Sequence, residues 1–255
     1  MPDRLRPWID SPATAGLFLD FDGTLAPIVD DPEMARPLPE ARPALTRLSG
    51  RLALVAVVSG RPAFYLGEYL GGAGTTRLIG LYGLERMRGD PPVVEDLPEA
   101  RPWREAVDTV AGRARTAAPP GVRVEHKGLT LTLHYRGADE QARWVDDFAA
   151  AEAATTGLVA HAGKKSVELR PPVATDKGSV IAELAGDLEA VCFIGDDAGD
   201  LPAFATLGRL RAAGRTTLAV AAGGSETPEE VLAGADVVVD GPAGVLALLQ
   251  TMAGT

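Results

Sequence analysis

Five aspartates in two short motifs carry the strongest chemical signal in the sequence. The first motif reads Asp-Phe-Asp-Gly-Thr at 20–24, and the second reads Gly-Asp-Asp-Ala-Gly-Asp at 195–200. An aspartate carboxylate can attack phosphorus and form an aspartyl-phosphate. A neighbouring carboxyl can donate a proton to the leaving group and later accept one from water. Asp20 and Asp22 lie two positions apart, so on an extended segment their side chains point the same way.

A hydroxyl and a cation complete this set. Ser59, in Ser-Gly-Arg at 59–61, and Lys177 can both bind phosphoryl oxygens. Asp20, Asp196 and Asp200 offer the hard oxygen ligands that suit Mg²⁺. Each segment alone also fits a plain turn, a helix cap or a solvated lysine. Their joint occurrence favours phosphoryl transfer, which depends mostly on positioning and on neutralising charge.

The elements that must position these residues alternate between strand and helix. Continuous apolar runs, each ending at a turn or an acidic residue, predict buried strands at 15–21, 52–58, 78–81 and 190–194. Further strands are predicted at 217–220 and 237–239, and helices at 40–50, 62–70, 177–186, 200–207 and 243–252. The segments at 20–24, 59–61 and 195–200 each directly follow a predicted strand, and Lys177 is the fourth segment of the set. In open α/β sheets, ligands bind at the carboxyl ends of the strands. The pattern indicates an α/β core with a mostly parallel sheet.

The middle of the chain has a different pattern. A Pro-rich acidic stretch at 91–98 reads as a linker. Helices are predicted at 99–116 and 138–154, and alternating strand pairs at 122–125 with 129–135 and at 157–161 with 165–169. We expect a core formed by 1–88 and 171–255, with a smaller α+β domain inserted at 89–170.

Composition excludes several classes of partner and site. The net charge is −10, which weighs against nucleic acid or an anionic membrane as the main partner. The single cysteine, Cys192, rules out an intrachain disulfide and a cysteine-rich zinc site. No apolar run approaches the ~20 residues that span a bilayer, and the N-terminus lacks the apolar segment of a secretory signal. We expect a soluble cytoplasmic protein.

The four segments together resemble the motifs of the haloacid dehalogenase (HAD) superfamily. Asp-Phe-Asp-Gly-Thr at 20–24 matches its first motif, Ser59 and Lys177 the second and third, and Gly-Asp-x-x-x-Asp at 195–200 the fourth. The resemblance implies a Rossmann-like core with a cap domain, Asp20 as nucleophile and Asp22 as general acid and base. It also implies Mg²⁺ held by Asp20, the Asp22 backbone carbonyl and Asp196, with Asp197 and Asp200 as supporting acids. Asp22 favours a phosphatase or phosphomutase over the ATPase pumps, which have Thr there.

Several further stretches resemble the trehalose-6-phosphate phosphatases of this superfamily. They are Val-Val-Ser-Gly-Arg at 57–61, Gly-Leu-Tyr-Gly-Leu-Glu at 80–85, Val-Glu-His-Lys-Gly at 124–128, Leu-His-Tyr-Arg at 133–136 and Gly-Lys-Lys-Ser-Val-Glu-Leu-Arg-Pro at 163–171. The resemblance implies trehalose 6-phosphate as substrate, read by Glu125, Arg136, Lys164 and Glu168, with Lys127 and Lys165 as neighbours. Arg61 can reach either the phosphate or the sugar. The family often has His-Gly where this chain has Tyr82-Gly83, and Tyr82 can still donate a hydrogen bond to a sugar hydroxyl.

Two other functions remain open on the sequence alone. One is a related phosphatase for sucrose phosphate, mannosyl-3-phosphoglycerate or glucosylglycerol phosphate. The other is a non-catalytic sugar-phosphate sensor, against which the intact Asp20 and Asp22 speak. A phosphomutase is less favoured, because nothing in the sequence marks a site that would retain a bisphosphate. A trehalose-6-phosphate synthase is a candidate partner.

Overall fold

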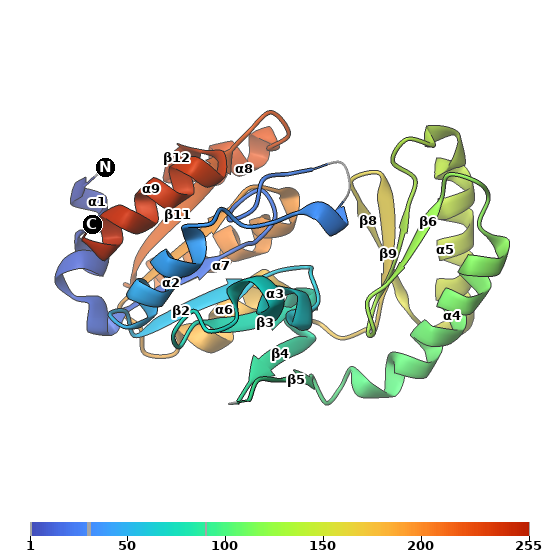
Figure 1. Cartoon of the computed structure of the whole chain (residues 1–255), viewed down its shortest axis with the longest axis horizontal. Coiled ribbons are helices and arrows are strands. Elements are labelled where there is room, and N and C mark those ends of the chain that lie inside the picture. The colour runs from blue at the N-terminus through green and yellow to red at the C-terminus, as the bar shows by residue number, and fades with distance from the viewer. Residues whose placement is uncertain (1, 30–31, 90, 255) are drawn as a thin grey trace. The chain divides into compact units, whose positions relative to one another are not determined.

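The computed structural model describes residues 2–29, 32–89 and 91–254, and this part of the chain divides into two compact units (Figure 1). Residues 1–95 and 175–255 form the first, which we call the core unit. Residues 96–174 form the second, which we call the insert unit.

The core unit is built on one long sheet with strand order β12-β11-β10-β1-β2-β3-β4-β5. Pairing is parallel from β12 through to β3, and β4 runs antiparallel to β3. The strands are β1 (Ala15–Leu19), β2 (Leu54–Val58), β3 (Arg77–Gly80), β4 (Glu85–Arg88), β5 (Val93–Asp96), β10 (Ala190–Gly195), β11 (Thr216–Gly223) and β12 (Val237–Asp240).

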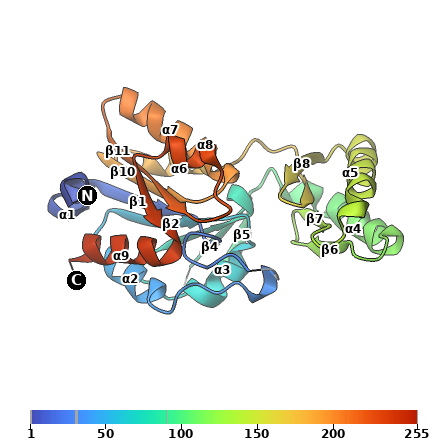
Figure 2. The same cartoon turned by 90° about the horizontal axis from the view of Figure 1, so that it is seen from above.

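Helices cover both faces of this sheet, because its central strands are apolar on both sides (Figure 2). Leu17 and Leu19 of β1 pack on one face, and Phe18 between them packs on the other. The first face lies against α1 (Pro2–Asp10), α2 (Ala41–Ser49), α3 (Ala63–Leu70) and α9 (Gly241–Ala253). The second lies against α6 (Lys177–Ala185), α7 (Leu201–Ala212) and α8 (Glu229–Gly234).

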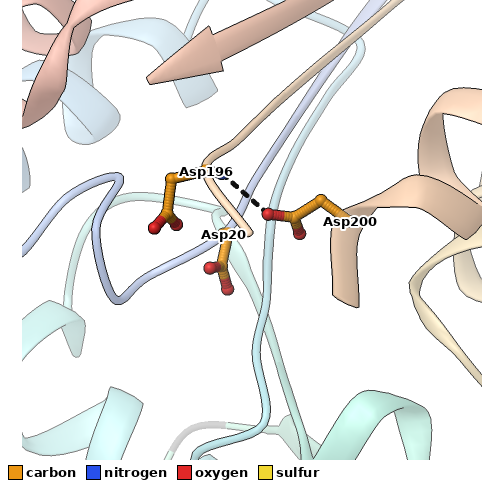
Figure 3. Close-up of side chains that lie close together, drawn as sticks. All are labelled: Asp20, Asp196 and Asp200. Atoms are coloured by element: carbon orange, nitrogen blue, oxygen red, sulfur yellow. Dashed lines mark hydrogen bonds between the residues drawn. The ribbon is translucent and has the colours of Figure 1, made fainter. Parts of the chain in front are cut away.

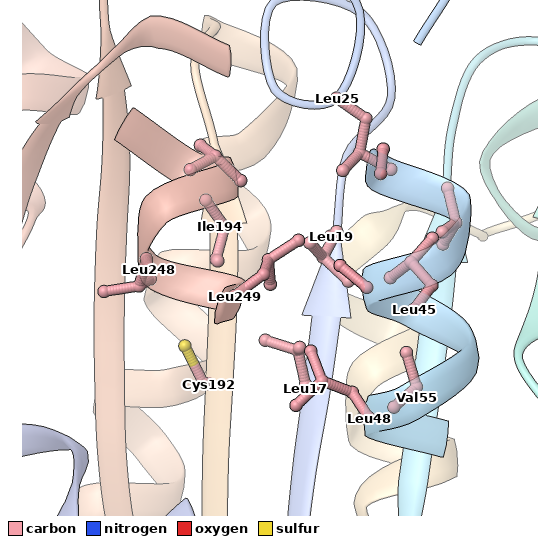
Figure 4. Packing of buried hydrophobic residues seen from close by; sticks show 14 of the residues in the cluster. Leu17, Leu19, Leu25, Leu45, Leu48, Val55, Cys192, Ile194, Leu248 and Leu249 are labelled. Atoms are coloured by element: carbon pink, nitrogen blue, oxygen red, sulfur yellow. The ribbon is translucent and has the colours of Figure 1, made fainter. Parts of the chain in front are cut away.

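Figure 4 shows the first face from close by. Leu17 and Leu19 of β1 and Cys192 and Ile194 of β10 point toward leucines of α2 and α9. Cys192 is fully buried there, which confirms the interpretation of this cysteine as a small core residue.

The insert unit has one four-stranded antiparallel sheet with order β6-β7-β9-β8. Its strands are β6 (Arg123–His126), β7 (Leu131–His134), β8 (Val159–Gly163) and β9 (Ser166–Arg170). Helices α4 (Arg104–Ala117) and α5 (Ala142–Thr156) lie together on one side of this sheet (Figure 1). They bury every second residue of β7 and β9, namely Leu131, Leu133, Val167 and Leu169. The alternate residues therefore form a polar second face.

The predicted fold class is confirmed, with corrections at the edges of the core sheet. The stretch 91–98, predicted as a linker, does contain the boundary between the two units, but it is partly regular, because Val93–Asp96 forms β5. Strand β4 (Glu85–Arg88) and helix α1 (Pro2–Asp10) were also not predicted. Three of the four residues of β4 and four of the nine residues of α1 are charged, and α1 contains Pro7, so neither has the apolar run that marks the central strands. Within the described residues, no helix is long and apolar enough to cross a membrane.

Candidate active site

Three neighbouring parallel strands of the core sheet end in the predicted site residues. Strand β1 leads into Asp20, β2 leads into Ser59, and the Gly195 end of β10 leads into Asp196. Since β10, β1 and β2 are adjacent and parallel, their carboxyl ends meet at one edge. Helix α6 adds its first residue, Lys177, to the same place. The backbone therefore assembles residues that lie far apart in the sequence.

Asp20, Asp196 and Asp200 form a buried acidic cluster (Figure 3). One carboxylate oxygen from each aspartate lies within 4.8 Å of the others. The Lys177 ammonium lies 2.8 Å from Asp20 Oδ1 and 2.5 Å from Asp200 Oδ1. All four side chains are at most 8% exposed, so three acids share one described lysine out of water.

Asp200 organises the loop that follows β10. Its Oδ2 accepts the backbone N–H groups of Asp196, at 2.8 Å, and of Asp197, at 3.0 Å, while its Oδ1 accepts from Lys177. Asp197 itself is exposed, and its Oδ1 accepts the Gly199 N–H and begins the short helix there. Asp200 thus holds other groups in position, whereas Asp20 and Asp196 present carboxylates to the cluster.

Burial raises the pKa of each acid in this cluster. For Asp196 it raises the pKa to about 8, and the nearby Asp200 and Asp197 add to the effect. Burial also raises the pKa of Asp20 and of Asp200, while Lys177 opposes it in both cases. For Lys177, burial lowers the pKa but Asp20 and Asp200 outweigh it, so the ammonium is held charged. Burial therefore disfavours the charged form of each acid, and the neighbouring carboxylates add to that cost.

The cluster fits a divalent cation with oxygen ligands. The donors are carboxylates only, they converge within 4.8 Å, and they are buried, so a bound cation would neutralise charge that is otherwise held out of water. The Asp20 and Asp196 carboxylates are the best-placed ligands, because both Asp200 oxygens already accept hydrogen bonds.

The first motif loop lies directly against this cluster. Gly23 has φ +72°, and a Cβ there would come within 2.0 Å of the Asp196 carboxylate, so only glycine fits. The Thr24 hydroxyl, fully buried, donates to Asp196 Oδ1 at 3.4 Å. Thr24 was not predicted as a site residue, although it belongs to the same motif as Asp20 and Asp22. The glycine and threonine of this motif therefore bring Asp196 next to the loop that carries Asp20 and Asp22.

Asp22 is held by Arg61 rather than by the acidic cluster. Arg61 donates to both Asp22 oxygens, from Nε at 2.8 Å and from Nη2 at 2.7 Å. The guanidinium also lies over the Tyr65 ring, 4.7 Å from its centroid. This two-point pair fixes the orientation of the Asp22 carboxylate. The structure thus gives Arg61 a contact that the sequence did not predict.

Ser59 and Tyr82 meet across Gly60. The buried Ser59 hydroxyl accepts the Arg61 N–H at 3.1 Å, and the Tyr82 N–H donates to the Ser59 carbonyl at 2.9 Å. A Cβ on Gly60 would lie 2.5 Å from the Tyr82 hydroxyl. Leu81 and Tyr82 have φ of +47° and +58°, which is strained for residues with a side chain. Tyr82 therefore packs on the Ser-Gly-Arg turn within the core unit.

The polar face of the insert sheet gathers two of the predicted sugar-reading residues. Glu125 and Glu168 lie in one cross-strand row, because both pair with Thr132 of β7. The Lys127 ammonium lies 3.4 Å from Glu168 and 3.7 Å from Glu125. His134, on the same face, contacts Glu125 at 2.7 Å. Glu125, Glu168, Lys127 and His134 therefore form one connected network of charged and polar side chains on this face of the sheet.

Glu168 is the most buried member of that network. Its oxygens accept from Thr130 at 2.9 Å and from Arg170 Nε at 2.7 Å. Burial acts to raise the pKa of the Glu168 carboxyl, but Lys127 and Arg170 outweigh it and hold the pKa below its usual value. The sequence analysis missed Arg170, although the strand period of two puts it on the same face as Glu168.

The other predicted residues of the insert lie at exposed positions outside this network. Arg136 follows β7 and Lys164 lies in the turn between β8 and β9, and both are exposed. Lys165, next to it, lies 2.7 Å from Asp139. These positions suit contacts with a ligand at the rim of the sheet face, whereas Glu168 is fixed by its neighbours.

Comparison with known proteins gives the same family by sequence and by structure. The family model of trehalose-phosphatases matches residues 18–231. The trehalose-phosphate phosphatase of Mycolicibacterium paratuberculosis is 39% identical over 203 residues, which cover 74% of this chain and 50% of the relative. The chain spans about half the length of the curated relatives it matches.

Two solved structures share the fold over nearly the whole chain. The C-terminal domain of the Candida albicans trehalose-6-phosphate phosphatase superposes with a TM-score of 0.78 at 25% identity and covers 99% of this chain and 97% of its own. A trehalose-6-phosphate phosphatase related protein also gives a TM-score of 0.78, at 23% identity, with 94% and 97% covered. The second likeness, at that identity, shows the fold alone.

Proposed function

The chain belongs to the trehalose-phosphatase family, and on that basis we propose that it hydrolyses trehalose 6-phosphate to trehalose and phosphate with the help of Mg²⁺. The observation that carries this proposal is the buried cluster at the end of β1. There Asp20 contacts Lys177 and lies within 4.8 Å of Asp196 and Asp200. A lone carboxylate near a lysine is an ordinary ion pair, but three converging acids with one lysine suit a metal-assisted phosphoryl transfer.

In the proposed mechanism Asp20 attacks the phosphorus atom in line, its carboxylate oxygen forms the new P–O bond, and the bond to the sugar O6 breaks. Asp22 donates a proton to the leaving O6 and then accepts one from the water that cleaves the aspartyl-phosphate. Arg61 holds both Asp22 oxygens, so this pair opens or shifts when the Asp22 carboxyl reaches the leaving group. Lys177 and Ser59 bind the phosphoryl oxygens. Asp200 keeps Lys177 and the Asp196 loop in place.

Asp20, Asp196 and the Asp22 backbone carbonyl would hold the Mg²⁺, with Asp197 and Asp200 as supporting acids. When bound, the metal supplies positive charge that offsets the repulsion between the phosphate dianion and the attacking carboxylate.

We assign substrate choice to the insert unit, acting as the cap of this enzyme. Glu125, Lys127 and Glu168 combine hydrogen-bond acceptors and donors in a fixed row, which suits the hydroxyls of a disaccharide. Arg136 and Lys164, which are exposed, and Tyr82 and Arg61 of the core unit complete the proposed substrate-binding set. The polar face is free of the helices of the insert, since α4 and α5 pack on the opposite face.

The test is phosphate release from a panel of sugar phosphates with Mg²⁺ and with EDTA. We expect release from trehalose 6-phosphate in Mg²⁺, and a much lower kcat/KM for sucrose phosphate, mannosyl-3-phosphoglycerate and glucosylglycerol phosphate. A preference for one of those three would replace the proposed substrate. Tight binding of trehalose 6-phosphate by calorimetry, without release of phosphate in Mg²⁺, would identify a sensor and overturn the proposal.

A further inference from the structure

The core unit contains a second polar feature that the proposed reaction does not use. A cavity of about 200 Å³ lies beside strands β3 and β4 and helix α6. Its lining includes three arginines and several apolar residues, among them Arg77, Arg86, Arg88, Ile79, Met87 and Leu184. None of these residues belongs to the acidic cluster or to the loops that carry it.

The three arginines converge because of the strand period. Arg77 and Ile79 are two residues apart on β3, so their side chains lie on the same face of the sheet, and the same holds for Arg86 and Arg88 on β4. Ile79 pairs with Arg86, so both strands present these residues on one face. One sheet face therefore presents three guanidinium groups beside α6. In a chain with net charge −10, such a concentration of positive charge is local and specific.

The acids around the cavity offset only part of this charge. Arg86 makes a two-point pair with Glu183 of α6, 2.6 Å between Nη1 and Oε1. Hydrogen bonding to Arg86 lowers the pKa of Glu183, and the charges of Arg88 and Arg77 lower it further. Arg88 also pairs with Glu95 at 3.2 Å, through side chains that are both more than half exposed, where an ion pair contributes little. An anion with several acceptor oxygens would balance the remaining charge.

We propose that this cavity binds a small phosphate-bearing anion, either free phosphate or a phosphate monoester with a short organic group. Guanidinium groups match phosphate oxygens in pairs, which is the geometry that several arginines on one face provide. The volume is smaller than the ~300–1,000 Å³ of sites for drug-sized ligands and larger than the ~30 Å³ share of one water. Ile79 and Leu184, on the same face as the arginines, give an apolar wall against which the organic group of an ester would pack.

The experiment measures binding to the full chain by calorimetry in EDTA at low ionic strength, with inorganic phosphate and phenyl phosphate as probes. Without metal, the acidic cluster repels both probes, which removes the catalytic site from the measurement. The test protein is Arg77→Ser/Arg88→Ser. The control is Arg42→Ser/Arg47→Ser, which removes the same charge from the exposed face of α2. The cations of the insert unit are unchanged in both, so a difference between the two variants belongs to the cavity.

We expect the cavity variant to bind at least about tenfold more weakly than the wild type, and the control to stay within about twofold. The charge-conserving Arg77→Lys/Arg88→Lys should fall between them, because lysine keeps the charge but loses the paired geometry. Tighter binding of phenyl phosphate identifies an ester as the ligand class, and equal binding identifies free phosphate. Equal affinities of the cavity variant and the control, with melting temperatures that show both are folded, would overturn the proposal, as would a wild type that binds neither probe.

Discussion

Lys177 is the one described cation that directly contacts the buried acids at the centre of the site, which makes the cluster sensitive to pH. Three carboxylates and one ammonium leave excess negative charge when no metal is bound. Burial raises the pKa values of Asp20, Asp196 and Asp200, and repulsion from neighbouring acids adds to the effect. Protonation of these acids therefore favours the folded, metal-free protein.

We predict that the metal-free protein loses stability as pH rises from about 5 toward the Asp196 pKa of about 8. An acid whose pKa is higher in the folded state stabilises the fold when protonated, and this contribution is lost as pH rises through the folded pKa. The measurement is the free energy of unfolding against pH in EDTA, for the wild type and Asp196→Asn. The difference between the two should change over this window and shrink in Mg²⁺. A difference that is constant with pH would contradict the predicted burial of this charge.

The sequence predicted the acids of this site but not how each is held. Asp20, Asp22, Asp196 and Lys177 were found from residue type and spacing. The ion pair between Arg61 and Asp22 depends on a loop conformation that residue spacing does not encode. The same is true of the two backbone N–H groups that donate to the Asp200 carboxylate. Thr24 and Arg170 were missed because a single threonine or arginine has many ordinary surface roles.

Among the elements, the turn after β2 depends on the strained segment that follows β3. We predict that Gly60→Ala destabilises the protein by about 1–3 kcal/mol and lowers kcat, because its Cβ would overlap the Tyr82 ring and displace Ser59 and Arg61. Denaturant unfolding and steady-state kinetics measure the two effects. Gly208→Ala is the matched control: it lies in α7 with open space around it, and we expect it to be neutral or slightly stabilising. Equal behaviour of the two variants would contradict the contact.

In the insert sheet, the row of charges gives a prediction for specificity. We expect Glu168→Gln to lower kcat/KM for trehalose 6-phosphate about 10–100-fold and to leave p-nitrophenyl phosphate hydrolysis within about twofold. The reason is that the amide keeps the shape of the side chain but loses the charge that Lys127 and Arg170 hold. Glu140→Gln, an exposed change outside this row, is the control. Equal losses on both substrates would place Glu168 in a structural role.

The central strands were predictable because a strand buried on both faces must be apolar throughout. Residues 52–58 therefore indicated β2 directly. At the sheet edge the same logic fails: β4 is Glu-Arg-Met-Arg, and its Glu85 is buried because it accepts the Ala63 N–H at the start of α3. That contact is made between distant segments, so no local pattern announces it.

At the scale of the whole molecule, each unit has its own apolar core. We predict that Leu133→Ala, which removes about 2–5 kcal/mol from the smaller core of the insert, abolishes trehalose 6-phosphate hydrolysis at temperatures where p-nitrophenyl phosphate is still hydrolysed. Leu17→Ala in the core unit should reduce both activities together. The measurement is the activity of each variant against both substrates as the temperature is raised. If Leu133→Ala lost both activities at the same temperature, the two units would unfold as one.

The net charge of −10 weighs against nucleic acid as a main partner, but it does not reveal how charge is distributed. Asp20, Asp196 and Asp200 lie together at the ends of the central strands, whereas three arginines of β3 and β4 line a cavity elsewhere in the core unit. Only the paired strands and α6 bring those arginines together, so composition alone could not predict the cavity.

The proposed mechanism requires that Asp20 becomes covalently phosphorylated. The direct measurement is acid quenching of the enzyme during turnover of trehalose 6-phosphate radiolabelled in its phosphate, followed by peptide mapping. We predict label on the peptide that contains Asp20, removable by hydroxylamine, in the wild type. Asp20→Asn should carry no label and release no phosphate while keeping its melting temperature. Turnover with no labelled protein, together with an active Asp20→Asn, would show that phosphate transfer does not pass through Asp20.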